Sequence, residues 1–297
     1  MVSHVELFRG NQRLGKYDLP TEVAGQDGRR FRLTYAIRKG GNGVVFEARP
    51  LNYTSSLPQK CAVKFLRQQD ASRMDRFRNE VRILRELAHP AISQYFDSGE
   101  LKIDGLAIPW VAMELGGDNL RRVVELTGTL GPPTLLAVLI QMAEALDHLH
   151  SKGIIHRDVK PDNFVLHHTQ AEAVQMIDFG IAKYATEDVS GRPMDQFTQQ
   201  QEFVGPVFFS SPELIAYASR KSQLVDHRSD LFQLGMVMWF LATGRIAAGV
   251  PARRSSPLGD DFYNLVFSLL SESPEDRPQT AAAVRDELEK LRAITAT

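Results

Sequence analysis

The chain has 297 residues, of which 43% are hydrophobic and 24% are charged, a composition typical of a globular protein with one or two domains. Its 35 Lys and Arg nearly balance its 36 Asp and Glu, so the net charge of −1 gives no overall field to hold a nucleic acid or an anionic membrane. A single cysteine, Cys61, excludes an intrachain disulfide and favours a reducing compartment.

The sequence also argues against a membrane protein. The most apolar windows, 135–140 and 234–242, are shorter than the roughly 20 residues that a transmembrane helix needs. The first residues lack the apolar stretch of a signal peptide. We therefore expect a cytoplasmic protein whose partners include neither a membrane nor a nucleic acid.

Residues 1–29 are polar, with turn signals at Gly10-Asn11 and between Gly25 and Gly28. Val5, Leu7 and Leu14 alternate with polar residues as in a short hairpin. A frayed or loosely docked extension explains the same composition equally well.

The next part of the chain, 30–115, is rich in predicted strands. We expect strands over 31–38, 44–49, 61–66, 92–96 and 106–113. Apolar residues at helical spacing predict one helix over 71–87, which His89-Pro90 ends. The antiparallel sheet and its helix form a small N-terminal lobe.

Gly116-Gly117 marks a break, after which 116–297 is mainly helical. The predicted helices span about 118–126, 133–151, 229–243, 261–271 and 279–293. The expected fold class is α+β, with a small sheet lobe followed by a larger helical lobe.

The densest functional signal is the stretch His156 to Asn163, which reads His-Arg-Asp-Val-Lys-Pro-Asp-Asn. It combines a candidate base, a cation and an amide within eight residues. An apolar run that begins at Ala173 follows and ends in Asp-Phe-Gly at Gly180. Together these segments resemble the catalytic loop and the metal-binding turn of the eukaryotic-like (Hanks-type) serine/threonine protein kinases. The resemblance covers about residues 31–293 and implies the bilobal kinase fold.

The resemblance assigns chemical roles in the helical lobe. Asp158 is the expected catalytic base, and Lys160 would neutralise charge on the transferred phosphoryl group. Asn163 and Asp178 offer the hard oxygen ligands that Mg²⁺ prefers, with Mn²⁺ as an alternative. His156 and Phe179 are expected to pack together rather than to react.

The sheet lobe would hold the nucleotide ATP. Gly40 and Gly43 would let backbone N–H groups approach the phosphates, although Arg38 stands where relatives carry the first glycine of this loop. Lys64 would anchor the α- and β-phosphates and would pair with Glu80 on the predicted helix.

The resemblance also places the adenine site. Its expected residues come from both lobes: Val45, Ala62 and Val165 around the ring, Met113 at the rear, and backbone groups from Glu114 to Gly116 at the edge.

Residues 178–213 would form the activation segment. Thr186, Ser190 and Thr198 are candidate acceptors for autophosphorylation, with Arg157 as the cation that receives the phosphate. Pro206 replaces a threonine that normally bonds the catalytic Asp and Lys, so we expect Asp158 to be oriented by Lys160 alone. The apolar run 207–209 predicts a preference for an apolar residue after the phosphorylated site.

Three further residues have expected structural roles. Glu213 and Arg277 fit a buried ion pair, and Asp230 fits a carboxylate that braces the catalytic loop. The interval 245–275 is too short for the additional helix that related kinases use for docking, and holds a single predicted helix. Substrate recruitment would then fall to a separate protein or to self-association.

The motifs together favour a serine/threonine protein kinase that uses ATP and Mg²⁺ to phosphorylate protein substrates. Two alternatives remain at this point. One is a pseudokinase that binds nucleotide as a scaffold, which Arg38 and Pro206 favour. The other is a small-molecule phosphotransferase of the antibiotic-kinase type, which shares the base, the asparagine and the metal-binding Asp.

Overall fold

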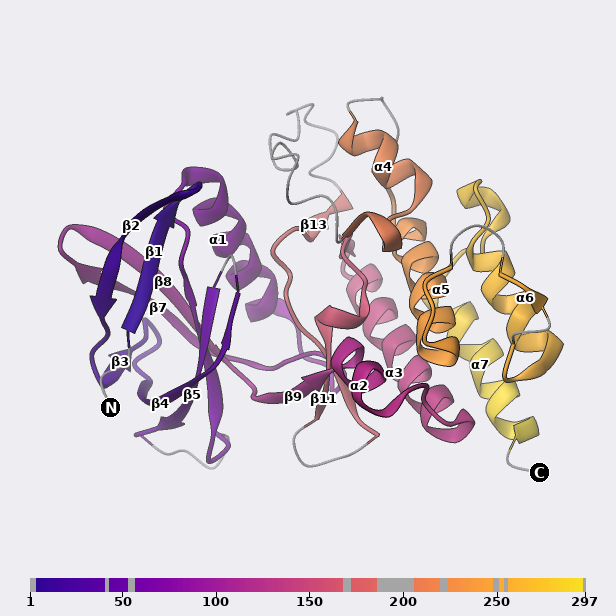
Figure 1. Cartoon of the computed structure of the whole chain (residues 1–297), viewed down its shortest axis with the longest axis horizontal. Helices are drawn as coiled ribbons and strands as arrows, with labels where there is room; N and C mark the ends of the chain where they lie inside the picture. Colours follow the sequence, from indigo (N-terminus) through magenta and orange to yellow (C-terminus); the bar gives the residue numbers. More distant parts are fainter. Residues whose placement is uncertain are drawn as a thin grey trace. The chain divides into compact units, whose positions relative to one another are not determined.

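A computed structural model describes residues 4–40, 43–52, 57–167, 172–185, 206–219, 224–247, 251–253 and 256–295. The chain divides into two compact units. The first comprises Met1–Ala88 and Ser93–Gly116, and the second comprises His89–Ile92 and Gly117–Thr297. The boundary at Gly116/Gly117 coincides with the predicted break, and Figure 1 shows the elements of both units.

A six-stranded antiparallel sheet in the order β3-β4-β5-β6-β8-β7 dominates the first unit. Its strands are β3 (Glu22–Ala24), β4 (Arg30–Lys39), β5 (Gly43–Pro50), β6 (Cys61–Leu66), β7 (Tyr95–Ile103) and β8 (Leu106–Met113). Aromatic side chains fill the core on one face, where Phe31 and Phe65 pack against Trp110. The predicted strand over 92–96 is wrong in extent, because β7 starts only at Tyr95 and continues to Ile103. Asp104-Gly105, both with positive φ, then form the tight turn into β8.

Helix α1 (Ala71–Glu86) matches the predicted helix closely. Asp70 caps its first turn by accepting a hydrogen bond from the Arg73 N–H at 3.0 Å. The buried face of the helix carries Phe77, Ile83, Leu84 and also Glu80. A buried glutamate among apolar residues requires a partner, which the functional site supplies.

The N-terminal residues form a docked hairpin rather than a frayed extension. Strands β1 (His4–Arg9) and β2 (Gln12–Asp18) pair antiparallel around the turn at Gly10. Val5 and Leu7 are 1% and 0% exposed and belong to the same apolar core as the sheet. Of the two explanations that the sequence left open, the structure supports the hairpin.

Helices are the main regular elements of the second unit. They are α2 (Leu120–Thr127), α3 (Pro132–Ser151), α4 (Pro212–Ala218), α5 (Arg228–Thr243), α6 (Gly259–Leu269) and α7 (Ala281–Thr295). Helix α3 packs against α5 and α7, and α6 packs against both α5 and α7 (Figure 1). Gly244 ends α5 with a left-handed backbone, as a glycine after a helix commonly does. Only the short α4 was not predicted from the sequence.

Two small sheets in the second unit hold the loop that carries the main motif. One sheet has the order β12-β11-β9, from β9 (Gly116–Asn119), β11 (Phe164–His167) and β12 (Val174–Met176). The other pairs β10 (Ile154–Ile155) with β13 (Lys183–Tyr184). Residues 156–163 therefore run from β10 to β11, and the Asp-Phe-Gly turn follows β12 directly. Within the described ranges, no helix has both the length and the apolar character to cross a membrane.

Candidate functional site

The first unit brings Lys64 and Glu80 together as the sequence predicts. The Lys64 Nζ lies 2.6 Å from the Glu80 Oε1, and the two side chains are 17% and 4% exposed. Burying two charges is costly, so their direct contact is what makes both tolerable at these positions. Strand β6 aims the lysine toward α1, and the i, i+3 and i+4 spacing puts Glu80 on the face that carries Phe77 and Leu84.

The segment that runs from Lys39 to Gly43, called the glycine segment below, is described at Lys39, Gly40 and Gly43. Of these, Gly43 lies beside the lysine of this ion pair. The Gly40 N–H donates to the Gly43 carbonyl at 2.9 Å and closes the base of the segment. A Cβ at Gly43 would lie 3.0 Å from the Phe65 carbonyl oxygen and 3.6 Å from the Lys64 side chain. Glycine at position 43 thus permits a close approach of β5 to the lysine strand.

The predicted adenine residues of the first unit also gather in one place. Ala62 and Met113 are paired across β6 and β8, and both belong to an apolar cluster against which Val45 packs. The Glu114 N–H donates to the Gln94 carbonyl at 2.9 Å, which fixes the chain just before Gly116. Val165, on β11, is buried and belongs to the second unit, whereas the cluster belongs to the first.

In the second unit, Asp230, near the start of α5, holds the beginning of the loop 156–163 by hydrogen bonds. Its carboxylate accepts hydrogen bonds from the backbone N–H groups of His156 and Arg157, at 2.8 and 2.7 Å, and contacts the His150 Nε2 at 2.9 Å. Burial favours a higher pKa for Asp230, but His150 and these N–H bonds outweigh it and hold the pKa below its usual range. The predicted brace is therefore present.

Asp158 is held by two side chains. Its Oδ2 lies 2.7 Å from the Lys160 Nζ and accepts from the Asn163 Nδ2 at 2.8 Å. The expectation that Lys160 alone orients Asp158 is therefore wrong, because Asn163 shares the task. Burial raises the pKa of Asp158 in spite of the opposing Lys160 charge.

The same asparagine suits a metal ligand. Its Nδ2 also donates to the Asp158 carbonyl at 2.8 Å, so both nitrogen contacts lie on one side and the amide oxygen is directed elsewhere. Asp178 has an exposed side chain and a left-handed backbone, with φ of 66°. A non-glycine residue in that region is strained, and such strain is concentrated at functional sites. The amide oxygen and the carboxylate fit a hard divalent ion that takes further oxygens from phosphates.

His156 and Phe179 pack as expected. Their ring centroids are 5.2 Å apart, and the His156 Nδ1 accepts from the Asp158 N–H at 3.2 Å. Burial lowers the pKa of His156, so the ring is neutral near pH 7 and serves as a packing element.

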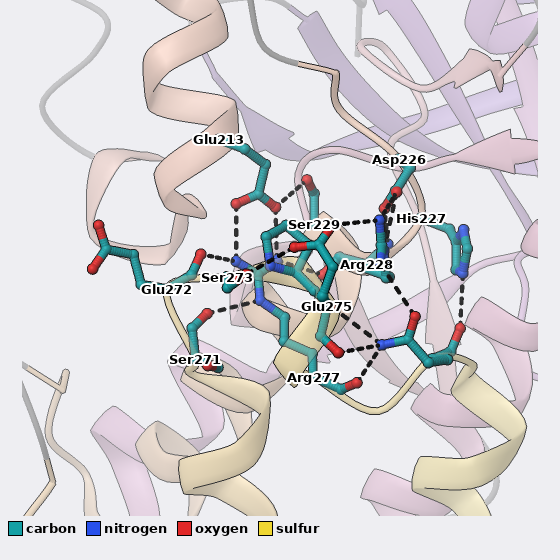
Figure 2. Close-up of polar contacts among 12 residues, drawn as sticks. Glu213, Asp226, His227, Arg228, Ser229, Ser271, Glu272, Ser273, Glu275 and Arg277 are labelled. Atoms are coloured by element: carbon teal, nitrogen blue, oxygen red, sulfur yellow. Dashed lines mark hydrogen bonds and ion pairs between the residues drawn. The ribbon is translucent and has the colours of Figure 1, made fainter.

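The predicted ion pair between Glu213 and Arg277 is bidentate and buried (Figure 2). The two guanidinium nitrogens lie 2.7 and 2.9 Å from the two carboxylate oxygens. Ser229 donates to the same carboxylate at 2.5 Å, and Arg277 also donates to the carbonyls of Ser271, Arg228 and Glu272. The pair thereby ties α4 to the segment before α7.

Two supporting residues escaped the sequence analysis. Gln233 accepts from the Val159 N–H at 3.0 Å and donates to the Arg157 carbonyl at 3.1 Å. Arg121 binds the Asp162 carboxylate at 2.8 Å and lies over the Phe209 ring. Gln233 could have been noticed in the sequence, because it is a polar residue one turn after Asp230 in an otherwise apolar helix. No comparable feature of the sequence points to Arg121.

Replacing Gln233 by Met should lower the free energy of unfolding by about 2–4 kcal/mol, because it leaves a buried N–H and a buried carbonyl of the loop unpaired. Urea unfolding measures this loss. Gln279, an exposed glutamine that also donates to backbone carbonyls, provides the control as Gln279→Met, with an expected change below about 1 kcal/mol. Equal effects of the two substitutions would contradict a special role for Gln233.

The activation segment is covered only at its two ends. Thr186, Ser190 and Thr198 lie outside the described residues. Of the predicted apolar platform, Phe208 is 57% exposed, but Phe209 is 1% exposed and packs edge-on against Phe240. Phe209 is therefore a core residue, and the platform is smaller than the sequence suggests. The predicted single helix within 245–275 is α6.

Comparison with known proteins agrees with this arrangement. The family model described as the protein kinase domain matches residues 31–288. The serine/threonine-protein kinase PknB of Mycobacterium tuberculosis is 33% identical over 283 residues, which cover 88% of this chain and 43% of that protein. The probable serine/threonine-protein kinase CE0033 of Corynebacterium efficiens is 31% identical, with 88% of this chain and 41% of that protein covered. The chain thus spans less than half the length of these relatives.

Proposed function

Because the chain belongs to the protein kinase domain family, we propose that it transfers the γ-phosphate of ATP to serine and threonine hydroxyls of proteins. The observation that carries the proposal is the set of contacts around Asp158, which Lys160 and Asn163 hold by one oxygen. The names of the relatives support the choice of serine and threonine as acceptors. Because this chain covers only 41% and 43% of these two relatives, the activity of the whole protein is also part of the proposal.

In this proposal, the first unit binds the nucleotide. Lys64, held by Glu80, contacts the α- and β-phosphates, and the backbone of Gly40 and Gly43 contacts the triphosphate. The first unit also contributes the apolar side chains of Val45, Ala62 and Met113 around the adenine and the backbone of Glu114 and Gly116 at its edge. Val165 is the adenine contact assigned to the second unit.

The second unit supplies the chemistry. Asp158 accepts the proton of the substrate hydroxyl as the oxygen attacks phosphorus, and the bond from phosphorus to the ADP oxygen breaks. Lys160 balances the charge that develops on the transferred group; burial lowers its pKa, but Asp158 and Asp178 outweigh this and raise it, so the ammonium stays charged. Asn163 and Asp178 would hold Mg²⁺, or Mn²⁺ instead, and the ion would offset the negative charge of the phosphates.

The remaining expectations are also part of the proposal. They are a cytoplasmic location, a protein substrate recruited by a separate protein or by self-association, and autophosphorylation of the activation segment. Arg157 is the cation proposed to receive the phosphate in autophosphorylation. It is buried, and its guanidinium lies over the ring of Tyr217 on α4, the helix in which the activation segment ends. Mass spectrometry after incubation with ATP would locate the modified residue.

Substrate preference offers a separate prediction. Because Phe208 presents an exposed aromatic ring just before α4, peptides with an apolar residue directly after the acceptor should be phosphorylated more efficiently, by about 5- to 10-fold. A peptide array that varies this position measures the preference, with Phe208→Ser as the variant that should lose it. A stronger response to acidic or basic neighbours would contradict the prediction.

One assay separates the proposed function from its two alternatives. The purified chain is incubated with labelled ATP and Mg²⁺ in the presence of a protein mixture or of aminoglycosides. Label on serine or threonine of proteins supports the proposal. ATP binding without transfer would identify a pseudokinase, and label on the aminoglycoside would identify a small-molecule phosphotransferase.

A further inference from the structure

The N-terminal hairpin is joined to the main sheet next to the glycine segment. The Phe8 N–H donates to the Arg67 carbonyl at 2.9 Å, and the Gln69 N–H donates to the Phe8 carbonyl at 2.8 Å. Phe8 thus forms a parallel bridge with Gln68, directly after β6. With Val5 and Leu7 buried in the common core, these bonds fix the hairpin to the strand that carries Lys64.

Arg67 connects this hairpin to the glycine segment. Its side chain is 8% exposed, and its Nη1 donates to the Gly40 carbonyl at 2.6 Å. The Nε donates to the Glu6 carbonyl at 3.0 Å, and the Nη2 lies 3.3 Å from the Glu6 Oε2. The guanidinium also lies 4.8 Å from the centre of the Phe8 ring. A planar guanidinium with contacts in several directions has little freedom to move, so it holds the Gly40 carbonyl in a defined place.

A second contact joins the same elements. The Lys39 ammonium forms an ion pair with the Glu6 carboxylate, which also contacts Arg13 and Arg67. A hydrogen bond from Lys39, aided by the charges of the two arginines, lowers the pKa of Glu6 and keeps the carboxylate ionised near pH 7. Two consecutive residues are therefore linked to Glu6. Lys39 contacts it directly, and Gly40 is linked to it through Arg67.

We propose that the N-terminal hairpin is a positioning element for the glycine segment, with Arg67 and Glu6 as the positioning residues. Glycine-rich backbone is permissive, so ordering it around a triphosphate costs conformational entropy. A segment already held at Lys39 and Gly40 pays less of that cost when the ligand binds. The hairpin precedes residue 31, where the match to the protein kinase domain begins, so this half of the contact lies outside the matched residues, whereas Arg67 lies within them.

The inference rests on the proposed function, because it assumes that the glycine segment contacts the phosphates of ATP. It has a specific signature. Loosening the segment should weaken the binding of a triphosphate but not of adenosine, which lacks phosphates. General damage to the fold of the first unit would weaken both ligands alike.

The test measures dissociation constants of MgATP and of adenosine by calorimetry, together with kcat and KM for ATP. Arg67→Met is expected to weaken MgATP binding roughly 10-fold and to leave adenosine binding within about twofold. The KM for ATP should rise while kcat changes little. Arg67→Lys, which keeps one donor, should recover part of the affinity.

Two further variants sharpen the test. Glu6→Gln keeps the apolar anchors of the hairpin and should weaken MgATP binding about threefold, which carries the test if Arg67→Met does not fold. Arg13→Gln removes an exposed partner of Glu6 that, among the described residues, makes no bond to Lys39 or Gly40, and it should bind MgATP as the unmodified chain does. Unchanged MgATP affinity in both Arg67→Met and Glu6→Gln, or equal losses for both ligands, would overturn the inference.

The same measurements distinguish this inference from the proposed function. An unmodified chain that binds MgATP but transfers no phosphate would contradict the proposed function and leave the binding test intact. An unmodified chain that does not bind MgATP would overturn both.

Discussion

Asp158→Asn should lower kcat for protein phosphorylation by about 10²- to 10⁴-fold, the usual contribution of a positioned acid–base group. The substitution keeps the size of the side chain and removes its ability to accept the hydroxyl proton. The KM for ATP should change little, because Asp158 is assigned to the acceptor hydroxyl rather than to the nucleotide. Steady-state kinetics with a saturating protein substrate measure both parameters.

The control for this prediction is Asp75→Asn, which changes an exposed aspartate on α1 paired with Arg78. It should leave kcat and KM unchanged, since exposed ion pairs contribute little even to stability. A variant with Asn at 158 that keeps more than about a tenth of the original kcat would contradict the role assigned to this carboxylate.

Arg277→Met should lower the free energy of unfolding by about 3–5 kcal/mol, because it leaves the Glu213 carboxylate buried without its bidentate partner. Three backbone carbonyls would lose a donor as well. Urea unfolding followed by circular dichroism measures the change.

The chain offers a matched control for Arg277. Arg253 also contacts a carboxylate, Asp260, and lies over an aromatic ring, that of Tyr263, but its side chain is 56% exposed. Arg253→Met should cost less than about 1 kcal/mol. Similar losses at positions 253 and 277 would show that burial does not govern the strength of the pair.

The pH dependence of the same pair has a defined sign. Burial favours a higher pKa for Glu213, but Arg277 and Ser229 outweigh it and lower the pKa below the model-peptide value of 4.5. The stabilisation is therefore complete above pH 4.5 and is lost as the pH falls through the lower pKa of the folded chain. The stability difference between the unmodified chain and Glu213→Gln should accordingly shrink as the pH falls below 4.5.

Much of this organisation could be predicted from the sequence. Apolar spacing located α1, α3, α5 and α7 to within a few residues, because long periodic segments carry a strong signal. Motif order placed Lys64 and Glu80 in contact, and likewise Asp158 and Lys160. The paired residues Glu213 and Arg277 were also predicted, although 64 positions separate them.

Other features depend on contacts that no local pattern encodes. The two-residue strands β10 and β13 are too short to show a period, yet they fix one end of the catalytic loop. Phe209 belongs to an apolar run that was assigned to a platform beside the acceptor, and only its packing against Phe240 reveals it as a core residue. The hairpin was ambiguous for the same reason: its stability comes from the core that Val5 and Leu7 join, and not from its own propensity.

The proposed phosphate transfer assigns one role to Lys64 in the first unit and another to Asp158 in the second. Its most direct test is the incorporation of labelled phosphate into a protein substrate by the unmodified chain, Lys64→Met and Asp158→Asn, measured side by side. Lys60→Met, which changes a half-buried lysine just before β6, the strand that carries Lys64, is the control. The account predicts that Lys60→Met is fully active and that each of the other two variants loses at least about 99% of the transfer. Transfer at more than about a tenth of the unmodified rate by either Lys64→Met or Asp158→Asn would contradict it.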